Sequence, residues 1–151
     1  MNFASRLFGI KKEYDVVVLK RRQIESLIRF NPGIKYITEE FYSLDLPITA
    51  HGTLRLHFQI TKEFPTKPIH IKVMNPVIHP WVNSNNGLVI GHPDLKFWSL
   101  HHSLGRIVRE IIEEFVRNPP KPKPPTTNIP SLSRPSHTQQ HVVNTNTTTT
   151  T

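Results

Sequence analysis

The sequence predicts an α+β fold, an antiparallel meander sheet with one helix before it and one helix after it. Apolar and polar residues alternate over residues 52–60 and again over 68–75, which is typical of half-buried antiparallel strands. Apolar residues recur at helical spacing over residues 103–118, which predicts an amphipathic helix. Because the strands follow one another and the helices stand at the ends, the order favours helices packed on one face of the sheet.

The remaining elements carry their own start and stop signals. Residues 15–30 place apolar side chains on one side and basic ones elsewhere, which predicts a helix that Asn31-Pro32-Gly33 ends. Residues 34–44 predict a weaker first strand, because the alternation breaks at Glu39-Glu40. In the last helix, Ser103 is the expected N-cap and the "RNPP" sequence that follows is the expected stop.

Composition limits the chemistry that the chain can perform. The 151 residues include no cysteine, which excludes disulfides, thiolate metal sites and thiol nucleophiles. The net charge of +8 favours an anionic membrane surface or an acidic partner. Nucleic acid is not expected as a partner, because no aromatic and basic sheet signature accompanies the charge. Neither a membrane span nor a secretory signal is expected.

The composition divides the chain into three parts. After Pro119 the chain is rich in Pro, Thr, Ser and Asn, and such a segment cannot bury enough apolar surface to offset its ordering entropy. We therefore expect an amphipathic segment at residues 1–12, a folded domain at 13–120, and a disordered Pro/Thr-rich tail at 121–151. The tail is interpreted as a linker, and its closing run of threonines is compatible with the cut end of a longer protein.

The first twelve residues predict contact with a membrane or a partner. At helical spacing, apolar residues share one face and basic residues border it, which is the composition of an interfacial anchor. A disordered tail, or a stripe that docks on its own domain, is the alternative. The candidate residues for contact with an anionic membrane surface are Phe3, Arg6, Leu7, Phe8, Ile10, Lys11 and Lys12.

Nine histidines raise the question of a metal site, and their spacing argues against one. No two of them pair at i, i+4 in the expected domain, and no cysteine or acidic cluster accompanies them. We expect no metal and no cofactor. His57 and His70 are expected on polar strand faces, and His79 is expected to orient a loop by hydrogen bonding.

The motifs from Phe64 to Ile90 follow the order of a known family. An aromatic-Pro-x-x-Pro step comes after a strand, with Phe64, Pro65 and Pro68. A His-Pro pair and a long loop with a glycine follow, at His79-Pro80 and Gly87. In this order the chain resembles the ubiquitin-conjugating enzyme fold over about residues 14–120, and the resemblance implies that fold.

The same resemblance implies that both catalytic positions are lost. In the family, an asparagine follows the His-Pro pair and helps to stabilise the oxyanion, and the catalytic cysteine stands three residues beyond the glycine. Here Trp81 replaces the asparagine and Ile90 stands at the cysteine position. An isoleucine side chain cannot form a thioester. The chain therefore resembles a non-catalytic ubiquitin-conjugating enzyme variant, with a structural loop that packs Val89 or Ile90 into the core.

The two end helices narrow the resemblance. The stretches "RRQIESL" and "HHSLGRIVREIIEEFVRNPP" resemble the first and last helices of the N-terminal domain of the A-type members of the vacuolar protein sorting-associated protein 37 family, which are ESCRT-I subunits. This implies a non-catalytic adaptor domain in ubiquitin-dependent endosomal sorting and membrane remodelling, cytoplasmic and peripheral on endosomal or autophagic membranes.

The resemblance also implies partners. These are other ESCRT-I subunits, bound through a C-terminal region that nothing in this chain resembles, and ubiquitin or ubiquitinated cargo, for which no contact residue can be named. The alternative is an inactive accessory variant that assists an active ubiquitin-conjugating enzyme.

Overall fold

The computed structural model describes residues 3–48 and 52–125, with side-chain surroundings from residue 15 onward. The elements in chain order are α1 (Phe3–Phe30), β1 (Lys35–Thr38), β2 (Phe41–Ile48), β3 (Gly52–Gln59), β4 (His70–Val73), β5 (Val77–Ile78), α2 (Pro93–Lys96), α3 (Leu104–Arg117) and β6 (Lys121–Pro122). The order of a first helix, an antiparallel meander, an irregular crossing and a last helix is the α+β order that the sequence predicts.

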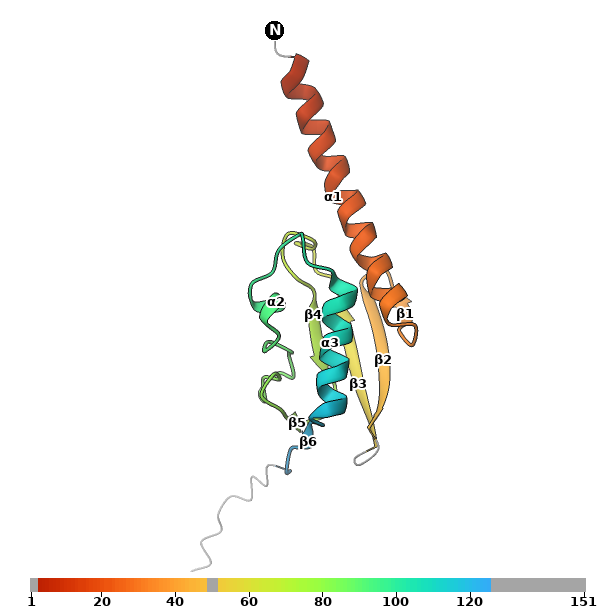
Figure 1. Cartoon of the computed structure of the whole chain (residues 1–151), viewed down its shortest axis with the longest axis vertical. Coiled ribbons are helices and arrows are strands. Elements are labelled where there is room, and N and C mark those ends of the chain that lie inside the picture. The colour runs from red at the N-terminus through yellow and green to blue at the C-terminus, as the bar shows by residue number, and fades with distance from the viewer. Residues whose placement is uncertain (1–2, 49–51, 126–151) are drawn as a thin grey trace, which may run out of the picture.

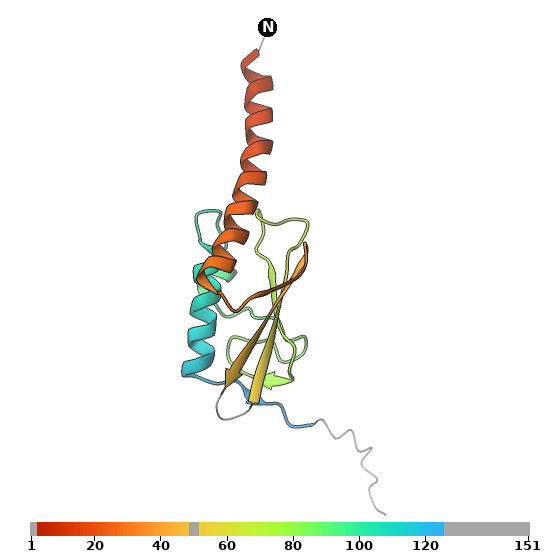
Figure 2. The same ribbon diagram turned by 90° about the vertical axis from the view of Figure 1, so that its right-hand side faces the viewer.

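The core lies between one sheet and one layer of helices. Strands β1 to β4 pair in sequence order, all antiparallel. In register, Leu44 faces Leu56 and Phe58 faces Ile71, so the apolar residues of neighbouring strands share one face. Figure 2 shows α3 and the end of α1 covering that face while the other face stays open. The alternation in the sequence is thus the signature of a sheet covered on one side.

The weak first strand predicted at residues 34–44 is in fact a hairpin. β1 ends at Thr38, Glu39 and Glu40 form the turn, and β2 begins at Phe41. The Thr38 hydroxyl accepts a hydrogen bond from the backbone N–H of Glu40, which helps to hold this turn. The break in alternation at Glu39-Glu40 marks the turn between two strands, so the main sheet has four strands where three were predicted.

Helix α1 is longer than predicted and crosses the boundary placed between residues 12 and 13. It runs without a break from Phe3, because no proline interrupts the sequence before Asn31. At 1.5 Å per residue, 28 residues span about 42 Å. Figure 1 shows its C-terminal part beside α3 and its N-terminal part running beyond the domain. The N-terminal segment is therefore a continuation of the first domain helix.

Helices α1 and α3 approach each other closely at Gly105. A Cβ atom at Gly105 would lie 2.1 Å from the carbonyl oxygen of Ser26, so no larger residue fits without a shift. Two polar side chains of α1, and that of Asn31 directly after it, tie this crossing to the start of α3. The Ser26 hydroxyl accepts from the Gly105 N–H at 3.0 Å, and the Gln23 amide oxygen accepts from the Leu104 N–H at 2.8 Å. The Asn31 amide donates to the Gly105 carbonyl at 3.0 Å.

Strand β6 and Lys123 extend the domain past the predicted boundary at residue 120. Lys121 and Pro122 pair with Ile78 and Val77, and the Lys123 N–H donates to the Pro76 carbonyl at 2.9 Å. The Lys123 ammonium also donates to the Ser84 carbonyl at 3.1 Å. Composition did not reveal these contacts, because backbone pairing and a single lysine contact leave no compositional signal. In the part of the chain that is described, no helix is both long and apolar enough to cross a membrane.

Candidate functional site

The loop between β4 and α2 runs along the edge of the sheet and is fastened to it. The Val89 N–H donates to the Ile71 carbonyl and the Val73 N–H donates to the Gly87 carbonyl, both at 2.8 Å. Gly87 has φ +74, and a Cβ there would lie 2.5 Å from the Val73 oxygen. Only glycine combines this backbone conformation with so close an approach.

The loop brings one apolar residue into the core and leaves the next in solvent. Val89 is buried, whereas Ile90, at the position implied for the catalytic cysteine, has 53% of its surface exposed. Of the two candidates for core packing, Val89 is the one that packs. Ile90 presents only hydrocarbon at the surface where the resemblance places a nucleophile.

Trp81 holds the end of the loop through its carbonyl group and its indole ring. The backbone N–H groups of Ile90 and Gly91 both donate to the Trp81 carbonyl, at 2.8 and 3.1 Å. A Cβ at Gly91 would lie 2.4 Å from Cδ1 of the Trp81 indole. The ring thus packs directly on the backbone beside Ile90, and Trp81 is partly buried.

His79 fixes the start of the loop, as predicted. Its Nδ1 accepts a hydrogen bond from the Trp81 N–H at 3.0 Å, and its ring lies edge-on to Phe115 of α3. Its Nε2 lies 3.9 Å from Glu114 and has no hydrogen-bond partner in the described residues. Burial lowers the pKa of His79, while the Glu114 carboxylate and the backbone of Asn118 act in the opposite direction.

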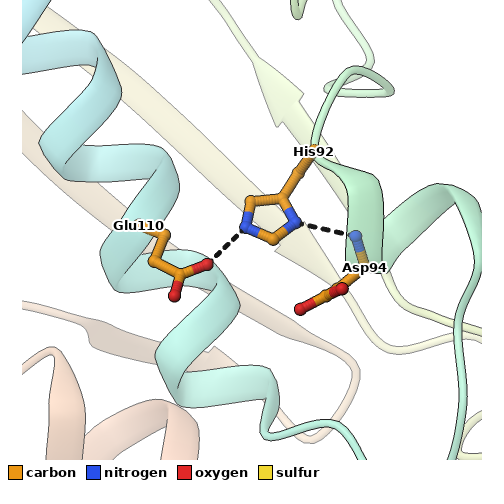
Figure 3. A group of neighbouring side chains, drawn as sticks. All are labelled: His92, Asp94 and Glu110. Carbon is orange, nitrogen blue, oxygen red and sulfur yellow. Dashed lines mark hydrogen bonds and ion pairs between the residues drawn. The ribbon is translucent and has the colours of Figure 1, made fainter.

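His92 ties the end of the loop to α3, as Figure 3 shows. Its Nδ1 accepts from the Asp94 N–H at 3.0 Å, which makes His92 the N-cap of α2. Its Nε2 lies 2.7 Å from the Glu110 carboxylate and donates to it, because the accepting Nδ1 leaves the proton on Nε2. The hydrogen bond from His92, with a smaller contribution from Arg106, lowers the pKa of Glu110.

His92, Asp94 and Glu110 also form a group whose ligand atoms lie within 4.8 Å of one another. Both nitrogens of His92 are already engaged in hydrogen bonds. Coordination through Nε2 would move its proton to Nδ1 and break the bond to the Asp94 N–H. The hydrogen-bonding pattern therefore gives His92 a structural role.

The predicted N-terminal contact residues lie on the first part of α1. The backbone there is helical from Phe3, so the helical spacing assumed for these residues holds. The surroundings of Phe3, Arg6, Leu7, Phe8, Ile10, Lys11 and Lys12 lie outside the described side chains. Their role stays a prediction.

Sequence reasoning missed the link from His92 to Glu110 and the exposed Phe97. Histidine is not a preferred N-cap, so the stretch His92-Pro93-Asp94 gives no clear signal of its role. Phe97 looks like an ordinary core residue in the sequence, yet 73% of its surface is exposed. Exposure depends on the path of the loop, which the sequence pattern does not reveal.

Fold and loop together define the class of protein. It is an α+β domain with the element order of the ubiquitin-conjugating enzyme fold, and Ile90 stands at the position that the resemblance implies for the catalytic cysteine. No family model matches the chain. Two solved ubiquitin-conjugating enzymes, one from Toxoplasma gondii and human E2 G1, match with TM-scores of 0.49 and sequence identities of 17% and 21%. These matches cover 66% and 69% of this chain, and 75% and 95% of theirs.

Comparison with curated proteins gives matches of higher sequence identity than the solved structures do. The chain is 31% identical over 114 residues to vacuolar protein sorting-associated protein 37A of Mus musculus and 30% identical over 119 residues to that of Homo sapiens. These matches cover 75% and 78% of this chain but only 28% and 30% of the relatives, so the chain spans less than a third of their length. The resemblance to the A-type protein, inferred from the end helices, is confirmed.

Proposed function

We propose that the chain is a non-catalytic adaptor domain of an ESCRT-I subunit, acting in ubiquitin-dependent endosomal sorting and membrane remodelling. The observation that carries the proposal is the loop itself, which presents Ile90 where the resemblance places the nucleophile. The similarity to the two 37A proteins supports the choice of complex. In this proposal the protein acts in the cytoplasm, peripherally on endosomal or autophagic membranes.

Absence of catalysis is tested with an engineered nucleophile. Incubated with activating enzyme, ATP and ubiquitin, the wild type is expected to form no reducible adduct. The Ile90→Cys variant is expected to transfer no ubiquitin to lysine, because Trp81 stands where the asparagine that helps the oxyanion would be. A reducible adduct of the wild type would contradict the proposal, and transfer by Ile90→Cys above the wild-type level would contradict the role given to Trp81.

Adaptor function is tested in the source cell. Affinity purification of the complete protein that contains this chain is expected to recover other ESCRT-I subunits, bound through a region outside this chain. Recovery of an active ubiquitin-conjugating enzyme without ESCRT-I subunits would favour the accessory-variant alternative. Ubiquitin or ubiquitinated cargo is a further expected partner, with contacts to be mapped on the isotope-labelled chain.

Contact with an anionic membrane is part of the same proposal. Full burial of an apolar side chain such as Phe or Leu contributes roughly 1.5–3 kcal/mol, and each nearby basic residue adds about 1 kcal/mol at an anionic surface. Partial immersion and the entropy of ordering reduce this to weak and reversible binding. Support comes from the helical backbone, which continues unbroken from Phe3 into the domain, so that Phe3, Leu7 and Ile10 fall on one face of the helix.

Liposome co-sedimentation tests the membrane contact. A variant in which Asp replaces Phe3, Leu7 and Phe8 together is expected not to sediment with anionic liposomes. Sedimentation of the wild type is expected to fall as the salt concentration rises. A matched control changes three exposed residues of the domain, Tyr36, Ile37 and Met74, to Asp, which alters the net charge equally. Equal sedimentation of the wild type and the N-terminal variant would remove the membrane from the proposal.

A further inference from the structure

An open groove of about 570 Å³ lies beside Ile90, between the start of β4, the loop and α2. Buried apolar side chains, among them Ile69, Ile71 and Val89, form its floor, and the more exposed Pro80 and Ile90 stand on its wall. Its volume falls within the range of roughly 300–1,000 Å³ typical of ligand sites. The groove is thus large enough to receive several side chains of a partner.

The walls of the groove are held in place before any partner binds. The Ile90 and Gly91 backbone N–H groups are bonded to the Trp81 carbonyl, and Val89 is bonded to Ile71 of β4. His92, which follows Gly91, is hydrogen-bonded to Glu110 of α3 and is the N-cap of α2. Leu95 of α2 lines the groove. A preorganised groove binds without a large cost of ordering its own chain.

Apolar surface continues from the groove onto the loop. Phe97, directly after the groove residue Lys96, is the most exposed large apolar side chain in the described part of the chain. The Lys96 ammonium lies 6.0 Å from the centre of the Phe97 ring. A concave apolar floor with exposed apolar residues beside it is typical of an interaction surface.

The charge of the groove indicates the chemistry of its occupant. Lys96 and His70 line the groove, and the residues that line it include no carboxylate. Within the described residues, Lys96 makes no ion pair with an acidic side chain. An occupant that brings its own carboxylate would give Lys96 a partner, whereas a basic occupant would meet repulsion.

We propose that this groove binds an extended segment of a partner protein that carries apolar side chains and a neighbouring Asp or Glu. This inference rests on the proposed adaptor function and names the kind of segment that the adaptor would receive. The chain's own tail fits poorly, because residues 126–151 contain no acidic side chain. The apolar side chains fill the groove beside Ile90, and the carboxylate lies at Lys96.

Selection from a display library of random decapeptides on the purified chain of residues 1–151 tests the proposal. The selected peptides are expected to combine apolar residues with Asp or Glu and to shift the amide resonances of Leu88 to Lys96. Lys96→Glu and Ile90→Asp are each expected to weaken binding at least tenfold. Lys20→Glu makes the same charge change on an exposed lysine of α1 and is expected to leave binding unchanged.

Several outcomes would overturn the inference. These are selected peptides without acidic residues, resonance shifts outside the groove, equal losses for Lys20→Glu and Lys96→Glu, or no enrichment of any peptide. Binding that appears only after removal of residues 126–151 would make the tail the occupant and would overturn it too. The selection uses the purified chain alone, so its failure would count against the groove and not against the proposed adaptor function. Failure to recover ESCRT-I subunits from cells would count against the adaptor function.

Discussion

At the scale of single residues, His79 connects the loop to helix α3 and makes the stability of the domain depend on pH. Burial lowers its pKa below the ordinary value of about 6.5, so the unfolded chain binds a proton at a higher pH than the folded chain does. Stability rises with pH wherever the unfolded state binds more protons. His79 therefore contributes its full share to the free energy of unfolding above the pKa that it has in the unfolded chain. This contribution is lost as the pH falls through the lower pKa that it has in the folded chain.

We expect the free energy of unfolding of the wild type to decrease as the pH is lowered from 7.5 to 5, measured by urea melts at each pH. His79→Asn is expected to be less stable at pH 7.5, because it loses the packing on Phe115, and to have a smaller pH dependence. His70→Asn, at an exposed position, serves as the matched control and should follow the wild type. Identical pH dependence in all three proteins would contradict this role of His79.

At the scale of elements, the crossing of α1 and α3 depends on the missing side chain at Gly105. Gly105→Ala would place a methyl group against the Ser26 backbone and force the two helices apart. The separation would also weaken the hydrogen bonds that Ser26 and Asn31 make with Gly105. We expect a loss of at least about 2 kcal/mol from overpacking and weakened hydrogen bonds, measured by urea unfolding.

A substitution at the residue after Gly105 serves as the control. It distinguishes crowding between α1 and α3 from a general effect of changing a residue in α3. Arg106→Ala changes the next residue, which is exposed and makes only a surface ion pair with Glu110, 3.3 Å away. It is expected to change the free energy of unfolding by less than about 1 kcal/mol. If Gly105→Ala were as mild as Arg106→Ala, the close approach of α1 and α3 would not be a constraint on the fold.

At the scale of the whole molecule, the pairing of β6 with β5 extends the domain past residue 120. Truncation after Pro120 removes that pairing and both hydrogen bonds of Lys123. We expect it to lower the free energy of unfolding by about 1–2 kcal/mol, with the domain still folded. Truncation after Pro125 keeps these contacts and is expected to match the full chain in urea midpoint and slope.

Each truncation has an outcome that would count against this boundary. Equal stability of the two truncated chains would show that residues 121–125 add nothing to the domain. A clearly smaller urea slope after truncation at Pro125 would show that residues beyond it bury surface in the folded state.

Features that depend on local pattern can be read directly from the amino-acid sequence. Alternation placed Leu54, Leu56 and Phe58 on the buried face of β3, and helical spacing placed Ile107, Ile111 and Phe115 in the core. Ser103 is the N-cap of α3, as predicted. The inferences about strands, helices and the cap succeed because periodicity and spacing are properties of neighbouring residues. Counting along the loop motif also assigns Ile90 and Trp81 to the two catalytic positions, and that assignment stays a prediction.

Contacts between distant parts of the chain, in contrast, are visible only in the folded structure. Gln23 bonds to the backbone of His102 and Leu104, and His92 bonds to Glu110 of α3. The packing of Trp81 on Gly91, the attachment of residues 121–123 and the charge of the groove likewise depend on how separate segments meet. The physical reason is that hydrogen bonds and close packing act over a few ångströms in space, whatever the separation along the chain.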